Sequence, residues 1–261
     1  MTKIQAVIFD WAGTTVDYGC FAPVNAFSLA FQAYGISPTI DEIRAPMGML
    51  KRDHIRTMLA MDRLKEQWIN IYGAKPDEAA VEKIYSVFEE ALMQSLAEYS
   101  SPKPGTVEAV LQLREMGIAI GSTTGYTNSM MDIVVKNAAK QGYQPDAWFT
   151  PDAVDGMGRP YPYMIYANMQ HFRIHSVDAV IKVGDTVADI REGKNAGVRS
   201  LGVLLGSSIL GLSQSEYEVL PQSEQNALLD KARKIFLDAG ADDVILDLGR
   251  LPAWLQTNNL V

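Results

Sequence analysis

The segment IQAVIFDWAGTTVD (Ile4–Asp17) sets the class of fold. Its apolar residues Ala6–Phe9 run directly into Asp10, and a Gly-Thr-Thr turn follows. This pattern is typical of a fully buried parallel strand that ends by presenting its last side chain at the carboxyl edge of the sheet. Ligands bind at that edge in open α/β sheets. Asp10 is therefore a candidate functional carboxylate, although an aspartate here could also cap the next helix.

Length and composition bound the class of protein. The chain has 261 residues and 48% hydrophobic content, enough for one large core or for a core with a smaller appended domain. A net charge of -8 argues against nucleic-acid or anionic-membrane partners. Cys20 is the single cysteine, no basic-then-apolar leader precedes the first strand, and no apolar run approaches the roughly 18 residues of a membrane span. We expect a cytoplasmic protein.

A long helical block follows the first strand. Its apolar spacing and its Pro and Asp punctuation predict helices at Ala22–Tyr34, Thr39–Arg44, Leu50–Met61, Leu64–Tyr72 and Asp77–Glu98. The SPKPG segment (Ser101–Gly105) ends this block. We expect the block to lie over the carboxyl edge of the first strand as a cap.

Strands and helices alternate in the rest of the chain. We predict strands at Ile118–Ser122, Ala147–Phe149, Ala179–Val183, Ser200–Val203 and Asp243–Leu246. The predicted helices are Thr106–Glu115, Asn128–Gln141, Tyr161–His171, Asp189–Ala196 and Gln222–Ala239. Such alternation predicts a doubly wound parallel sheet. The sequence therefore indicates an α/β core of residues 1–19 and 101–261, with an all-helical cap domain of residues 20–100 inserted into it.

Three later segments bring polar side chains to this edge. In GSTTGYT, Thr124 offers a hydroxyl suited to phosphate oxygens, or it simply forms a turn. In GMGRPYP, Arg159 would supply a cation to a phosphoryl group, unless it is an ordinary solvated loop arginine. In VIKVGDTVADI, Asp185 ends a strand, and with Asp10 it would form the oxygen-only site that Mg²⁺ prefers. Asp189 is either a helix cap or a support for that metal site.

These motifs, in this order and with a helical insertion after the first, resemble the haloacid dehalogenase superfamily of phosphoryl-transfer enzymes. The resemblance implies that Asp10 is a nucleophile and that Thr124 and Arg159 hold the phosphoryl group. It further implies a Mg²⁺ site formed by Asp10, the backbone carbonyl of Ala12 and Asp185, with Asp189 in support.

Ala12 departs from the pattern of most phosphatases in that superfamily. They carry a second aspartate there, a general acid that protonates the leaving alkoxide, and alanine cannot transfer a proton. The segment APMGMLKRDH (residues 45–54) offers Lys51 instead. An apolar stretch and a helix N-terminus would both favour its neutral, nucleophilic amine, although taken alone Lys51 would be an ordinary surface lysine.

With Lys51 included, the resemblance narrows to the phosphonoacetaldehyde hydrolase family, or phosphonatases. It rests on DWAGTTVDYGCFAP, PMGMLKRDH, GSTTGYT, GRPYP and VGDTVADI. The resemblance implies Mg²⁺-dependent cleavage of phosphonoacetaldehyde to acetaldehyde and phosphate, in 2-aminoethylphosphonate degradation. It also implies a Schiff base on Lys51 and an aspartyl phosphate on Asp10. Because an iminium is an electron sink for the departing carbanion, no acid is then required at position 12.

Several neighbours are candidates for the substrate pocket. His54 lies one helical turn after Lys51 and could tune the amine, or it is a core-capping histidine. Cys20 and Tyr126 resemble residues that line the family's pocket, although Cys20 could be a small buried hydrophobe. Met47 would contact substrate or fill the cap's interior.

The apolar segment Ala22–Phe31 suggests a homodimer formed through the cap domains. Its phenylalanines could equally pack within one cap.

Two rival functions remain open. A phosphomonoesterase or sugar phosphomutase would share Asp10, Thr124, Arg159 and Asp185, but it would need an acid at position 12 and would have no use for Lys51. A non-catalytic binding module would tolerate loss of the nucleophile or of the metal pair, and both are present. Sodium borohydride separates the two enzymes, because it traps substrate only on a Schiff-base enzyme.

Overall fold

Five parallel strands form the sheet of the core. The computed structural model of the chain describes residues 2–261. The strand order is β2-β1-β3-β4-β5, so β1 lies in the middle of the motif-bearing strands, next to β2 and β3. The strands are β1 (Ala6–Phe9), β2 (Ala119–Ser122), β3 (Val180–Gly184), β4 (Arg199–Val203) and β5 (Asp243–Ile245). The carboxyl ends of β1, β2 and β3 therefore meet at one edge, and the expected doubly wound parallel sheet is confirmed.

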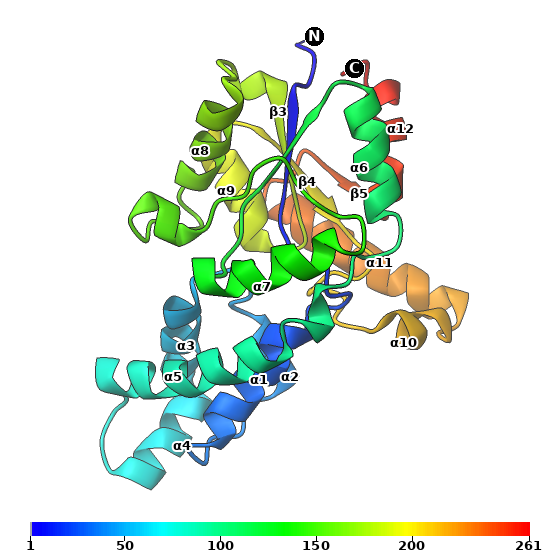
Figure 1. Ribbon diagram of the computed structural model, residues 1–261. Helices are drawn as coiled ribbons and strands as arrows, with labels where there is room; N and C mark the ends of the chain where they lie inside the picture. The colour runs from blue at the N-terminus through cyan, green and yellow to red at the C-terminus, as the bar shows by residue number, and fades with distance from the viewer. Residues whose placement is uncertain (1) are drawn as a thin grey trace.

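Helices cover both faces of this sheet (Figure 1). On one side are α6 (Thr106–Glu115) and α12 (Leu251–Thr257), and on the other are α8 (Tyr163–Phe172), α9 (Val187–Ala196) and α11 (Gln222–Asp238). Successive side chains of β1 point to opposite faces of the sheet, so each face has apolar residues for a layer of helices to cover. Val7 and Phe9 join one hydrophobic cluster, and Ala6 and Ile8 join another. All four side chains are fully buried, as expected for a strand covered on both faces.

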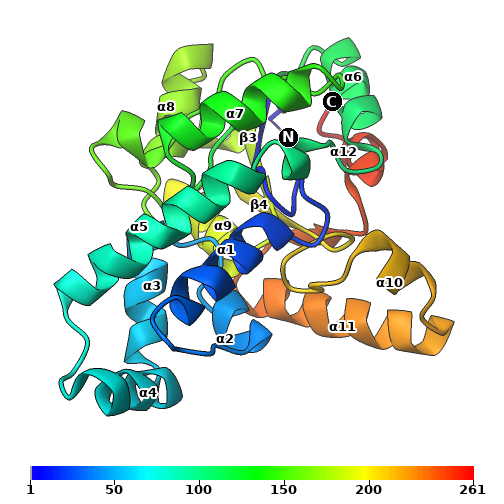
Figure 2. The same ribbon diagram turned by 60° about the horizontal axis from the view of Figure 1, so that its bottom comes forward.

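The helical block after β1 lies at the carboxyl edge of the sheet (Figures 1 and 2). It contains α1 (Phe21–Gln32), α2 (Ile40–Arg44), α3 (Lys51–Ala60), α4 (Asp62–Tyr72) and α5 (Glu78–Ser95). Helices α1 and α5 pack against each other, with the rings of Phe27 and Phe88 stacked at 4.1 Å between centroids. Helix α7 (Asn128–Ala139) follows β2 and packs against the short 3-10 helix Glu98–Ser100, which comes directly after this block. We call the block α1–α5 the cap.

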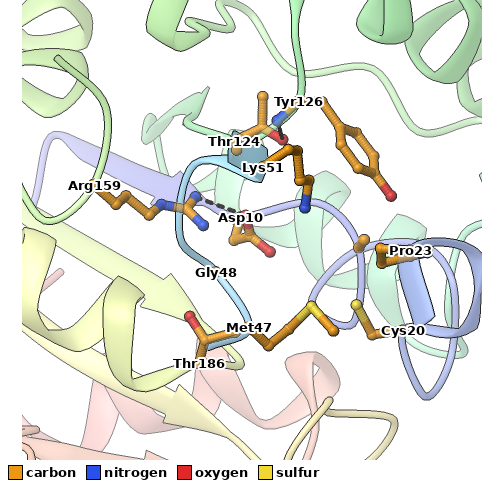
Figure 3. A pocket seen from close by; sticks show the side chains of 12 residues that line it. Asp10, Cys20, Pro23, Met47, Gly48, Lys51, Thr124, Tyr126, Arg159 and Thr186 are labelled. Carbon is orange, nitrogen blue, oxygen red and sulfur yellow. Dashed lines mark hydrogen bonds and ion pairs between the residues drawn. The ribbon is translucent and has the colours of Figure 1, made fainter. Parts of the chain in front are cut away.

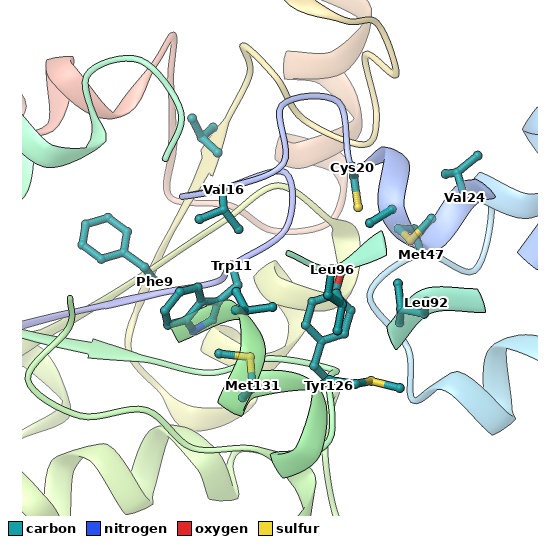
Figure 4. Close-up of a cluster of buried hydrophobic side chains, with 14 of the residues drawn as sticks. Phe9, Trp11, Val16, Cys20, Val24, Met47, Leu92, Leu96, Tyr126 and Met131 are labelled. Carbon is teal, nitrogen blue, oxygen red and sulfur yellow. The ribbon is translucent and has the colours of Figure 1, made fainter. Parts of the chain in front are cut away.

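The cap and the core share one hydrophobic cluster (Figure 4). Trp11 and Val16 come from the loop after β1, whereas Val24, Met47 and Leu92 come from the cap, and all five are buried. Because this cluster continues across the boundary, the structure shows the cap closed on the core.

The predicted strand at Ala147–Phe149 is wrong. This segment follows the edge of β2 but forms only one bridge, between Thr123 and Phe149. The Asp146 carboxylate accepts the Ile120 N–H at 2.7 Å, so a side chain occupies the donor that a neighbouring strand would need.

Two short helices escape the sequence pattern. Helix α10 (Gln214–Glu218) begins with a Ser213–Glu216 capping box but buries no side chain, so it has no apolar spacing to detect. Helix α12 has only seven residues, with a proline in its first turn. Over residues 2–261, the structure contains no helix with the length and apolarity that a membrane crossing requires.

Candidate active site

Asp10 and Arg159 form the centre of the site. Asp10 comes directly after β1, and Arg159 comes from the loop before α8. Arg159 Nη2 donates to Asp10 Oδ1 at 2.6 Å, and both side chains are buried (Figure 3). Burial alone would lower the pKa of Arg159, but the charges of Asp10, Asp189 and Glu192 outweigh it and raise that pKa. The guanidinium is therefore a permanent cation beside the candidate nucleophile.

A buried network holds the other edge of Arg159. Its Nη1 lies 3.0 Å from Asp189 Oδ1, and its Nε lies 2.9 Å from Glu192 Oε2. Lys182 Nζ pairs with the same two acids, at 2.9 and 3.3 Å. The hydroxyl of Thr123 joins them, donating to Glu192 and accepting from Lys182 and Arg159 at 2.8–2.9 Å. These contacts fix the orientation of the guanidinium.

Sequence reasoning missed Lys182 and Glu192. A signal was present for Lys182, since a lysine inside the apolar run VIKVG must be paired if the strand is buried. Glu192 follows Asp189 by one helical turn, which places both acids on the same face of α9.

Three carboxylates form a candidate metal centre. Oxygen atoms of Asp10, Asp185 and Asp189 lie within 4.8 Å of one another. Burial, followed by the charges of Asp10 and Asp189, raises the pKa of Asp185 to about 7. Such crowding of buried carboxylates is relieved by a divalent cation, and oxygen donors suit Mg²⁺. The residues present therefore fit the metal that the superfamily resemblance implies.

The three acids differ in how their oxygens are engaged. Asp185 accepts the Thr14 hydroxyl at 3.1 Å and the Ser208 N–H at 2.7 Å. Asp189 pairs through Oδ1 with Arg159 and Lys182, and through Oδ2 with Thr186 in a capping box at the start of α9. Both acids have both oxygens engaged, but Asp189 pairs with two cations whereas Asp185 accepts hydrogen bonds from uncharged donors. The geometry therefore favours a supporting place for Asp189 and a ligand place for Asp185.

Lys51 reaches this site from the cap. Helix α3 begins at Lys51, and the side chain is only 8% exposed. Its amine lies 5.1 Å from the centroid of the Tyr126 ring and points into the cavity beside Asp10 (Figure 3). Burial lowers the pKa of Lys51, and the charge of Arg159 lowers it further against the opposing effects of Cys20 and Asp10. A neutral amine is therefore accessible close to the candidate nucleophile.

One small cavity between the core and the cap gathers most of the predicted site residues. Core residues and cap residues meet in its wall, which consists of Asp10, Ala12, Cys20, Pro23, Met47, Gly48, Lys51, Thr124, Gly125, Tyr126, Arg159 and Thr186. Its volume of about 20 Å³ is enough for about one water molecule. A small organic substrate therefore requires the cap to move away from the core.

Cys20, Thr124 and Tyr126 form part of this wall. Thr124 Oγ1 accepts the Tyr126 N–H at 3.1 Å, which ties the two residues into one turn after β2. Burial, followed by the charges of Asp17 and Asp185, raises the pKa of the Cys20 thiol well above its usual value, so the thiol is neutral. Burial likewise raises the pKa of Tyr126.

The structure places His54 in the interior of the cap. Its ring stacks on Phe27 at 3.9 Å between centroids, and its Nε2 lies 2.9 Å from the carbonyl oxygen of Ile43. Burial and the charge of Lys51 lower the pKa of His54 well below its usual value. This position favours the core-capping alternative for His54 over direct substrate contact.

Comparison with known proteins identifies the family. The model of the haloacid dehalogenase-like hydrolases matches residues 4–197. The chain belongs to the haloacid dehalogenase-like hydrolase family, and it is an enzyme.

Two curated relatives at 48–49% identity are phosphonoacetaldehyde hydrolases. The phosphonoacetaldehyde hydrolase of Lysinibacillus sphaericus (strain C3-41) is 49% identical over 257 residues, covering 98% of this chain and 96% of that protein. The phosphonoacetaldehyde hydrolase of Bacillus cereus (strain AH820) is 48% identical over 254 residues, covering 97% and 96%. A crystal structure of a phosphonoacetaldehyde hydrolase like protein from Oleispira antarctica superposes with a TM-score of 0.94 at 35% identity, covering 98% of this chain and 92% of that one. The resemblance found in the sequence is confirmed.

Proposed function

We propose that this hydrolase cleaves the carbon–phosphorus bond of phosphonoacetaldehyde to give acetaldehyde and phosphate, in the degradation of 2-aminoethylphosphonate. The names of the relatives support this substrate. The observation that carries the proposal is the buried amine of Lys51, with its lowered pKa, in the same cavity wall as Asp10 and Arg159. A cytoplasmic location is part of the proposal, in keeping with the single cysteine.

Lys51 prepares the leaving group. Its neutral amine adds to the aldehyde carbon and loses water, which gives an imine that is protonated at nitrogen. This iminium can accept the electron pair of the carbon–phosphorus bond, so the carbon departs as an enamine rather than as a free carbanion. The alanine at position 12 is consistent with this chemistry, because no alkoxide is expelled.

Asp10 accepts the phosphoryl group. Its carboxylate attacks phosphorus in line with the bond that breaks, which gives an aspartyl phosphate and the enamine. Arg159, held by Asp189 and Glu192, offsets charge on the phosphoryl oxygens. Mg²⁺, held by Asp10, Asp185 and the Ala12 carbonyl, would supply further Lewis-acid neutralisation of that charge.

Water completes the cycle. It hydrolyses the aspartyl phosphate and restores the carboxylate of Asp10. Protonation of the enamine carbon returns an imine, and hydrolysis of that imine releases acetaldehyde and Lys51. The net reaction consumes one water molecule for each acetaldehyde and phosphate formed.

The test measures acetaldehyde and phosphate release from phosphonoacetaldehyde with Mg²⁺, together with borohydride trapping followed by mass spectrometry. The native protein should release the two products in equal amounts and acquire a reduced adduct at Lys51. Lys51→Arg should lose both signals, with turnover reduced at least about 10³-fold because the amine that forms the imine is gone. Asp10→Asn should lose phosphate release but keep the adduct.

Lys65→Arg is the matched control, since Lys65 is an exposed cap lysine paired with Asp62. It should behave as the native protein does. Near-native turnover by Lys51→Arg would exclude the imine mechanism. Hydrolysis of an ordinary phosphate ester, with no acetaldehyde from the phosphonate, would favour the phosphomonoesterase.

A further inference from the structure

Arg44 connects the cap directly to the core. It is the last residue of α2, and its guanidinium donates to three backbone carbonyls. Nη1 lies 3.0 Å from the oxygen of Gly19 and 2.9 Å from that of Ser208, and Nη2 lies 3.3 Å from that of Gly211. Ser208 and Gly211 belong to the core loop after β4, whereas Gly19 lies in the segment that joins β1 to the cap. The cap is therefore anchored by a charged side chain as well as by apolar packing.

The core loop leaves room for this guanidinium because residue 211 is a glycine. Gly211 adopts a φ of 64°, and a Cβ atom there would lie 2.8 Å from Arg44 Cζ. The centroid of the Phe21 ring also lies 5.5 Å from Arg44 Cζ. A side chain at position 211 would displace the guanidinium, so the glycine and the arginine depend on each other.

One of the three residues whose carbonyls Arg44 binds, Ser208, also orients Asp185. The N–H of Ser208 donates to Asp185 Oδ2 at 2.7 Å, and its hydroxyl donates to the backbone oxygen of Asp185 at 3.3 Å. Arg44 therefore contacts the core one residue away from a carboxylate of the candidate metal centre. An arginine that bonds a carbonyl through a rigid fork restricts the position of that peptide.

The loop that leads to Lys51 begins directly after Arg44. Residues 45–50 bring Met47 and Gly48 into the cavity wall and end where α3 starts at Lys51. Gly48 lies so close to the core that a Cβ atom there would be 2.5 Å from Thr186 Oγ1. The placement of Arg44 thus fixes one end of this loop, and Lys51 is at the other end.

We propose that Arg44 is a positioning residue that latches the cap onto the core and sets Lys51 and Asp185 in place together. Its bonds to Ser208 and Gly211 join the cap to the core, so they form on closure and break when the cap opens to admit substrate. Removing the latch lowers the population of the closed state, which raises the apparent KM more than it lowers kcat. The effects on turnover rest on the proposed function, but the latch itself does not.

The experiment compares Arg44→Met and Arg44→Lys with the native protein. Methionine keeps an apolar contact with Phe21 and removes every donor. In Arg44→Met without substrate, hydrogen–deuterium exchange should accelerate in residues 17–22 and 206–212, and Mn²⁺ binding measured by electron paramagnetic resonance should weaken. KM for phosphonoacetaldehyde should rise about tenfold, the effect of losing charge-assisted hydrogen bonds that are partly exposed, with a smaller change in kcat. Arg44→Lys should recover part of each effect.

Arg63→Met is the matched control. Arg63 lies on α4 and pairs with Glu42 of α2, the helix that ends with Arg44. Its contacts stay within the cap. It should leave exchange in the two segments, Mn²⁺ binding and KM unchanged.

Native exchange and native KM in Arg44→Met would overturn the latch. Gly211→Ala provides a second variant, because it displaces the guanidinium while Arg44 remains. If Arg44→Met does not fold, accelerated exchange in Gly211→Ala supports the latch, and native exchange there overturns it. Accelerated exchange in a protein that does not process phosphonoacetaldehyde would retain the latch and reject the proposed function.

Discussion

Asp17 shows how a single buried carboxyl couples the fold to pH. Its oxygens accept the N–H groups of Phe21 at 2.9 Å and Ala22 at 3.0 Å, which caps the start of α1. Burial is the largest effect on this group and raises the pKa of Asp17 from 3.8 to about 7. Between these two values the folded state binds more protons than the unfolded state. The stability contributed by Asp17 is therefore greatest at low pH, and it falls as pH rises toward 7, by at most about 1.4 kcal/mol per pH unit.

Replacing Asp17 with asparagine should remove this pH dependence. The native protein should exceed Asp17→Asn in its free energy of unfolding by more at pH 5 than at pH 7. This native-to-variant difference should change by about 1 to 2 kcal/mol between the two pH values. Urea denaturation with a metal chelator present measures both free energies of unfolding. Asp77→Asn, at the exposed N-cap of α5, is the control for replacing a helix-capping carboxylate with an amide. A native-to-variant difference that is constant with pH would contradict the raised pKa.

The place of a single residue in the site was predictable where that residue belongs to a sequence motif at the end of a strand. Asp10, Thr124 and Arg159 line one cavity with Lys51, as their positions after strands and at a helix start suggested. Lys182 and Glu192 had local signals, a lysine inside a buried strand and an acid one turn after Asp189, but local spacing does not identify their partners. Arg44 had no such signal, because its partners Ser208 and Gly211 are distant in sequence.

Helix α9 organises the buried charges at the scale of elements. It places Asp189 and Glu192 toward Lys182 of β3 and toward Arg159. Glu192→Gln should leave the two cations short of one buried negative charge. Removing one partner of a buried ionic cluster costs about 3 kcal/mol of stability. Phosphate release should also fall, about tenfold or more, because Arg159 is no longer fixed.

A double-mutant cycle tests this assignment. Adding Lys182→Met to Glu192→Gln removes a cation as well, so the pair should lose less stability than the sum of the single variants. Borohydride trapping at Lys51 should persist in every variant. Lys194→Met is the control, because Lys194 lies on the same helix but pairs with Asp242 at the surface, where it should change stability by less than about 1 kcal/mol. Strict additivity would show that the two residues do not act together.

Elements were predictable where apolar residues recur at helical spacing or form a nearly continuous run. Helix α5 shows the first pattern and strands β1 and β3 show the second, and each was expected close to its observed position. The strand expected at Ala147–Phe149 failed because the Asp146 side chain takes a backbone donor of β2, an interaction that competes with strand pairing and leaves no trace in hydrophobicity.

For the whole molecule, the insertion of a helical block after β1 was predictable, but its closed position was not. Closure depends on contacts between segments far apart in sequence, such as Met47 with the cluster around Trp11 and Arg44 with the loop at Ser208. Apolar patterning shows that a face is buried, but not which partner buries it.

The homodimer expected from the sequence would form through helix α1 of the cap. Phe27 and Phe31, on which the expectation partly rested, are fully buried within the cap, whereas Leu29 on the same helix is 56% exposed. We propose that the caps pair through this outer face of α1, and light scattering should then give twice the chain mass of 28.7 kDa. Leu29→Asp should shift the protein toward monomer, because a charge buried without a partner opposes association. Leu237→Asp is the control, since Leu237 is 46% exposed on α11 in the core. A native monomer at micromolar concentration would reject the dimer but not the latch, because every bond of Arg44 lies within one chain.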